Sequence, residues 1–158
     1  MKIEPPRKVS RSFTQAICRP PAEVFPLLCP VREAQWVNGW HPRLVLTESG
    51  HAEPGCIFIT SGMPEDAIWI MTEFDDERYR VGIYKVIPGV VVGEISVRLR
   101  PDGDDGSFAD ITYAYTALSE YGSRMLDGFT EAHFVSFMET WENELNHYLT
   151  TGTRLELG

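Results

Sequence analysis

The chain has 158 residues, of which 43% are hydrophobic and 23% charged, as expected for one globular domain with a single core. A net charge of −9 repels phosphate backbones, and no basic patch offsets it, which argues against nucleic-acid binding. No apolar run approaches the roughly 20 residues that span a bilayer, and the N-terminus has no signal-peptide core, so we expect a cytoplasmic protein without a membrane span.

The N-terminal third predicts one strand followed by two short helices. Residues 1–7 are expected to be disordered, and in residues 8–18 the side chains of Val9, Phe13 and Ile17 share one strand face with Arg11 and Gln15. Residues 19–37 then read as two helical pieces, because prolines are tolerated in a first turn but interrupt a longer helix. The Asn38-Gly39 pair is a natural stop for the second piece.

Six strands are predicted between residues 43 and 118. Their segments are rich in β-branched and aromatic residues, and every break carries Gly, Pro or Asp. The connections are too short for parallel crossovers, so the strands are expected to be antiparallel. In residues 66–75 the alternation leaves open whether Trp69 or its neighbours Ile68 and Ile70 face inward.

A long helix is predicted from Phe129, with Asp127 as N-cap, to a stop at Gly152. Apolar side chains and His133 recur at intervals of four along it. The helix and one sheet face must bury each other. We therefore predict an α+β fold, with a curved antiparallel sheet of about seven strands, two short helices and one long C-terminal helix, as a single domain over residues 1–158.

Three stretches carry a resemblance to a known family: "PPAEVFPLLCPVREAQWVNGW", "YTALSEYG" and "FMETWENELNHYLTTG". They resemble the SRPBCC superfamily, which includes START-like domains, the birch pollen allergen group and polyketide cyclases. The resemblance implies a helix-grip fold over nearly the whole chain. It also implies a cavity between sheet and long helix for lipid-, polyketide- or hormone-like molecules, but no single reaction.

The alternation of side chains in the strands and the apolar row of the long helix predict a set of cavity residues. Tyr113 and Tyr115 share one strand face with Ile111, and their hydroxyl groups need partners if buried. The full set of candidate ligand-binding residues is Arg32, Trp36, Trp40, Trp69, Tyr84, Ile95, Tyr113, Tyr115, His133, Phe137 and Trp141.

Two of these assignments leave alternatives open. Trp36 and Trp40 either anchor the short helices against the sheet or wall the mouth of the cavity, where His41 or Arg32 provides a polar end. Arg32 stacked on Trp36 would form a cation–π pair. His133 is either a core or rim histidine with one hydrogen-bonded neighbour, or a polar anchor that transfers protons inside the cavity.

Other chemistry finds little support. The histidines are scattered, and Cys18, Cys29 and Cys56 match no zinc spacing, so we predict no metal site, no cofactor and cysteines that are small buried hydrophobes. The chain has no nucleophile elbow and no phosphate-binding glycine loop, and "DGDDG" reads as a hairpin turn rather than a calcium loop.

We therefore predict a carrier or sensor that encloses an apolar or aromatic small molecule. The alternative is an enzyme of cyclase or dehydratase type, in which His133, Tyr113, Tyr115 or Arg32 moves protons. A third reading, an interaction module like the Hsp90-activator branch of the superfamily, requires an exposed apolar patch. Homodimer formation stays open.

Overall fold

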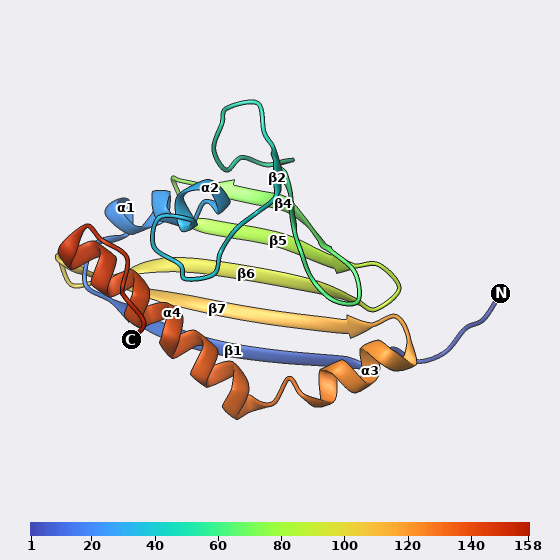
Figure 1. Ribbon diagram of the computed structural model, residues 1–158. Coiled ribbons are helices and arrows are strands. Elements are labelled where there is room, and N and C mark those ends of the chain that lie inside the picture. Colours follow the sequence, from blue (N-terminus) through green and yellow to red (C-terminus); the bar gives the residue numbers. More distant parts are fainter.

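The computed structural model describes all residues, 1–158, and consists of one curved sheet with helices on one of its faces (Figure 1). The strands are β1 (Lys8–Ile17), β2 (Leu44–Leu46), β3 (Ile57–Thr60), β4 (Ala67–Asp75), β5 (Arg80–Ile87), β6 (Val91–Asp102) and β7 (Gly106–Ala117). The helices are α1 (Pro21–Val24), the 3-10 turn η1 (Phe25–Leu27), α2 (Pro30–Glu33), α3 (Glu120–Asp127) and α4 (Glu131–Thr151).

The predicted helix-grip fold is confirmed. All strand pairs are antiparallel, in the order β1-β7-β6-β5-β4-β3-β2, so that each strand from β2 to β7 pairs with the next one along the chain. The first strand returns beside the last one, where α4 packs against it. Residues 1–6 have no secondary structure and lead away from the sheet (Figure 1). No helix combines the length and the apolar character needed to cross a membrane.

The two polar side chains that interrupt the apolar face of β1 hold the long helix. Gln15 is 1% exposed, and its Nε2 donates to the Met138 carbonyl at 2.9 Å. Arg11 donates to the Phe129 carbonyl at 3.3 Å and pairs with Glu131 at 3.2 Å. These hydrogen bonds offset the cost of removing the polar groups from water. Arg11 and Gln15 can therefore share the inward face of β1 with its apolar side chains.

In its first half, the buried face of α4 differs from the predicted row at intervals of four. Phe134, Met138 and Leu145 are fully buried, whereas His133 and Phe137 are exposed. The reason is helical geometry: with 3.6 residues per turn, positions four apart rotate by about 40° at each step, so a row at strict intervals of four starts on the exposed side at His133 and Phe137 and reaches the core only at Leu145.

The ends of α4 also correct one prediction and confirm another. The helix begins at Glu131, where Thr130 rather than Asp127 caps it by accepting a hydrogen bond from the His133 N–H at 3.2 Å. It stops at Gly152, in the left-handed region with φ 73°. The preceding residues form the separate helix α3, which the sequence analysis did not recognise, with Ser119 as N-cap.

Gly122 lets α3 lie directly on the β5–β6 turn, because a Cβ atom there would be 1.9 Å from the Val90 carbonyl oxygen. We expect Gly122→Ala to lower the free energy of unfolding by about 1–3 kcal/mol, since the helix must move off the turn. Urea denaturation measures this loss, with Gly128→Ala as the matched control, where the nearest atom is 3.5 Å away. Equal losses in the two variants would contradict the close approach.

Candidate ligand-binding cavity

A cavity with two lobes lies between the inner face of the sheet and the helices. The first lobe, about 410 Å³, is bounded by the sheet, α3 and the start of α4. The second, about 590 Å³, is bounded by the sheet, the segment after α2 and the middle of α4. Both volumes lie within the range of small-molecule sites. Trp69, Lys85, Tyr113 and Phe137 line both lobes, so the two lobes adjoin along a shared wall.

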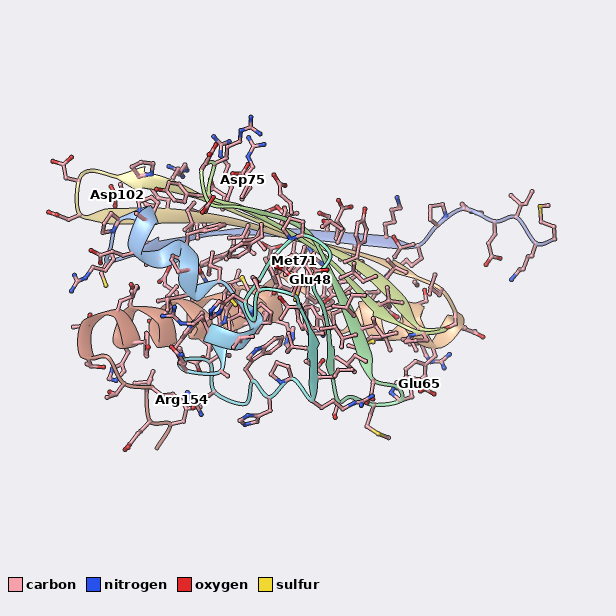
Figure 2. All side chains as sticks on the ribbon, turned by 90° about the horizontal axis from the view of Figure 1, so that it is seen from above. Glu48, Glu65, Met71, Asp75, Asp102 and Arg154 are labelled. Atoms are coloured by element: carbon pink, nitrogen blue, oxygen red, sulfur yellow. The ribbon has the colours of Figure 1, made fainter.

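Figure 2 shows the sheet and α4 as two layers with side chains filling much of the space between them. Met71 of β4 lies in this layer and is 1% exposed, together with Phe58 and Phe134 in the same core cluster. These core side chains fill the space between the sheet and α4 next to the cavity. The cavity walls are therefore held by a packed core rather than by loops alone.

The structure settles the direction of Trp69, which points inward, while the residues on either side of it point outward. Its ring stacks on Phe58 with centroids 5.4 Å apart, and Trp40 packs edge-on at 5.6 Å. The Trp69 Nε1 donates to the Thr60 hydroxyl at 2.9 Å. These contacts fix an aromatic wall at one side of the second lobe.

The two tryptophans of the opening segment have different roles. Trp36 is 0% exposed, packs on Trp141 at 5.3 Å and donates from Nε1 to the Leu27 carbonyl at 3.1 Å. It is a core residue and lines neither lobe. Trp40 does line the second lobe, and its Nε1 donates to the Pro30 carbonyl at 2.8 Å. Trp36 therefore anchors the segment in the core, and Trp40 borders the second lobe.

Arg32 and Tyr84 lie outside the cavity, which corrects their assignment as ligand-binding residues. Tyr84 is 39% exposed on the outer face of β5, because Ile83 and Lys85 on either side of it face inward. Arg32 donates to Gln35 at 3.2 Å instead of stacking on Trp36, whose ring is buried in the core.

The other nominated residues border the cavity. Ile95 and Trp141 line the second lobe, and Tyr115 lines the first. His133 lines the first lobe from an exposed position, so it lies at the rim rather than in the core. Phe137, which is 43% exposed, stands between the lobes and solvent.

Two charged residues that were not predicted as site residues, Lys85 and Glu33, also border the cavity. Lys85 lies on the inner face of β5 with its Nζ 4.6 Å from the centre of the Trp69 ring, and it has neither an ion pair nor a hydrogen bond. Burial lowers its pKa from the ordinary value. The alternation of Val81, Ile83 and Ile87, all directed inward, places Lys85 in this row, so the pattern of β5 contained the signal.

Glu33 ends α2 and borders the second lobe. Its carboxylate has no ion pair, and burial raises its pKa to about 8, so the side chain is mostly protonated at neutral pH. A helix of four residues is too short for its periodicity to show which side is buried. No pattern in the sequence therefore identified Glu33.

The tyrosine hydroxyl groups complete the polar part of the cavity. Burial raises the pKa of Tyr115 to about 12 and raises that of Tyr113 further, so both stay protonated at neutral pH. Neither hydroxyl group has a hydrogen-bond partner within the protein. Every fully enclosed side-chain nitrogen or oxygen does have one, which places these unpaired groups against open cavity space.

A glycine brings Tyr115 toward Lys85. Trp69, Lys85, Gly93 and Tyr115 are register partners across four adjacent strands. A Cβ atom on Gly93 would lie 2.5 Å from the Tyr115 ring, so this ring occupies the space that a side chain would fill. Gly93 is on β6, between Tyr115 on β7 and Lys85 on β5. The ring of Tyr115 therefore leans across Gly93 in the direction of Lys85.

The structure also shows where the three cysteines and the possible metal ligands lie. Cys29 and Cys56 are buried and free, as predicted, but Cys18 is exposed because it follows the inward-facing Ile17. No group of three or more His, Cys, Asp or Glu side chains is arranged to hold a metal ion.

Comparison with known proteins supports the fold. No family model and no curated protein matches the sequence. Norcoclaurine synthase from Thalictrum flavum is similar in structure, with 9% identity, a TM-score of 0.68 and coverage of 92% of this chain and 88% of that one. CalU16 from Micromonospora echinospora has 19% identity, a TM-score of 0.60 and coverage of 94% and 84%.

Ara h 8.0201 is a third similar structure, with 10% identity, a TM-score of 0.59 and coverage of 88% of this chain and 98% of that one. Identities this low establish a shared fold and leave ligand and activity open. The chain therefore shares the helix-grip fold of these structures, and the fold that the sequence resemblance implied is confirmed.

Proposed function

We propose that the protein binds an apolar or aromatic small molecule in the two-lobed cavity and acts as a carrier or sensor of it. The observation that carries this proposal is the cavity wall itself. It is mainly apolar, with several aromatic side chains, and Glu33, Lys85, Tyr113 and Tyr115 border it without a hydrogen bond or an ion pair in the protein. Small-molecule sites combine an apolar lining with a few placed polar groups in this way.

The comparisons agree with such a role. One structure of norcoclaurine synthase is a complex with dopamine and hydroxybenzaldehyde, so the same fold accommodates small aromatic molecules in that protein. The outer face of this sheet, by contrast, carries exposed ion pairs such as Arg100–Asp110. That surface is a poor candidate for an apolar interaction module.

A second candidate function is an enzyme of cyclase or dehydratase type that uses the same cavity. The observation in its favour is Glu33, whose pKa of about 8 suits proton transfer near neutral pH. Turnover of a polyketide-like substrate that is abolished by Glu33→Gln would favour this candidate over the carrier.

The first experiment is native mass spectrometry of freshly purified protein, followed by organic extraction. The carrier role predicts a stoichiometric adduct that extraction removes. Protein without an adduct is then titrated with the neutral fluorescent probe N-phenyl-1-naphthylamine, which should bind one to one. Failure of both measurements would contradict a ligand-binding cavity.

A cavity-filling variant tests where the probe binds. Ile95→Phe adds volume at the wall of the second lobe, and we expect it to weaken probe binding about tenfold, or roughly 1.4 kcal/mol. Tyr84→Ala is the matched control, because Tyr84 lies on the neighbouring strand but on the outer face. A larger effect of Tyr84→Ala would place the probe on the outside of the sheet.

A further inference from the structure

Lys85 is the only lysine or arginine that borders either lobe of the cavity. It lies in the wall that the two lobes share, and no carboxylate pairs with it, although the chain has 23 Asp and Glu residues. Charged groups in protein interiors are normally paired, since an unpaired one loses hydration without compensation. The positive charge of Lys85 therefore lacks a counter-ion within the protein.

Glu33 does not serve as that counter-ion. The two side chains border the same lobe, but no ion pair or hydrogen bond joins them, and burial disfavours the charge of each. Because Glu33 is mostly protonated at neutral pH, it also does not repel a negative group that enters the cavity. The other titratable groups around the lobes are His41, Tyr113, Tyr115 and His133, none of which is anionic at neutral pH.

We infer that Lys85 binds the acidic group of the ligand, which is a small organic anion with an apolar or aromatic body and one carboxylate-like group. This inference rests on the proposed function and adds the chemical class of the ligand. The acidic group lies at the junction of the lobes, and the body extends along the aromatic wall formed by Trp69, Phe58 and Trp40.

Tyr115 supplies a second donor for such a group. Its ring leans over Gly93 toward Lys85, and its hydroxyl group stays protonated and has no partner in the protein. The ammonium group and the hydroxyl group can then each donate to one oxygen of the acid. Hydrogen bonds to charged acceptors are roughly twice as strong as neutral ones, so this pair favours an anion over a neutral analogue of the same shape.

Two fluorescent probes with the same ring system test the inference. 8-Anilinonaphthalene-1-sulfonate carries an acidic group, and N-phenyl-1-naphthylamine is the same scaffold without it. The variant Lys85→Met keeps an apolar stem but removes the charge. We expect it to weaken binding of the sulfonate about 10- to 100-fold and to change binding of the neutral probe by less than about twofold.

Two further variants separate charge from shape. Lys85→Arg should retain most of the affinity for the sulfonate, and Tyr115→Phe should reduce it about three- to fivefold without affecting the neutral probe. Urea denaturation of each variant shows separately that it is folded.

The outcomes distinguish the two proposals. Equal effects of Lys85→Met on both probes, or no effect on the sulfonate, overturn the anion site while leaving the cavity intact. If the wild-type protein binds neither probe, the proposed function and the anion site both fail.

Discussion

Replacing Trp36 by alanine is expected to lower the free energy of unfolding by about 3–5 kcal/mol. The indole is 0% exposed, packs against Trp141 and donates to the Leu27 carbonyl, so its removal leaves a large void and an unpaired acceptor. Trp36 also joins the short helices to α4 through this packing. The loss is therefore expected to loosen the segment that closes the second lobe.

Trp40→Ala is the comparison that makes this result informative. Trp40 borders the cavity and is only partly buried, so its removal should cost less stability but should weaken N-phenyl-1-naphthylamine binding severalfold. Urea denaturation and probe titration on both variants separate the two roles. The division fails if Trp40→Ala destabilises the protein as much as Trp36→Ala, or if Trp36→Ala weakens probe binding without lowering stability.

The strands were predictable because the sheet is antiparallel with one buried face. In β6 the side chains of Val91, Ile95 and Val97 alternate with exposed Glu94 and Ser96, and this pattern depends only on the two-residue repeat of a strand. The ends of α4 were predictable to within a few residues, but the side that it buries was not. With 3.6 residues per turn, a row of side chains four residues apart does not stay on one side of the helix. The placement of α3 depends on Gly122 lying on Val90, a tertiary contact that no local pattern contains.

The cavity was predictable in kind and only in part by residue. Inward alternation places Tyr113 and Tyr115 at the wall, and the same rule applied to β5 would have exchanged Tyr84 for Lys85. The residues after α2 could not be placed, because the side of a four-residue helix that meets the cavity is decided by its tertiary anchors.

Those anchors come from the C-terminal part of the chain. Buried Glu144 of α4 accepts hydrogen bonds from the Asn38 backbone and side chain at 3.2 and 3.0 Å. Arg154, in the tail after α4, donates to the Ala34 carbonyl. These contacts hold the α2 segment against α4, and Glu33 is kept at the wall of the second lobe although burial disfavours its charge.

Glu33→Gln should therefore stabilise the protein at alkaline pH. The pKa of Glu33 rises from 4.5 to about 8 on folding, so between these values the folded state holds a proton that the unfolded state releases. Unfolding then becomes easier as the pH rises through this window, by at most about 1.4 kcal/mol per pH unit. Glutamine has no such dependence, and the variant should exceed wild type by about 2–4 kcal/mol above about pH 8.

Urea denaturation of both proteins at several values between about pH 5 and about pH 9 measures this difference. Glu53→Gln is the matched control, because hydrogen bonds from Ser49, the Glu48 backbone and Thr47 lower the pKa of Glu53 to about 2. Its contribution is present above the ordinary carboxyl range and is lost only as the pH falls below it, so this variant should leave the slope between about pH 5 and about pH 8 unchanged. A difference between wild type and Glu33→Gln that stays constant across the window would mean that Glu33 is ionised in the folded protein. The cavity would then contain a negative charge beside the site proposed for an organic anion.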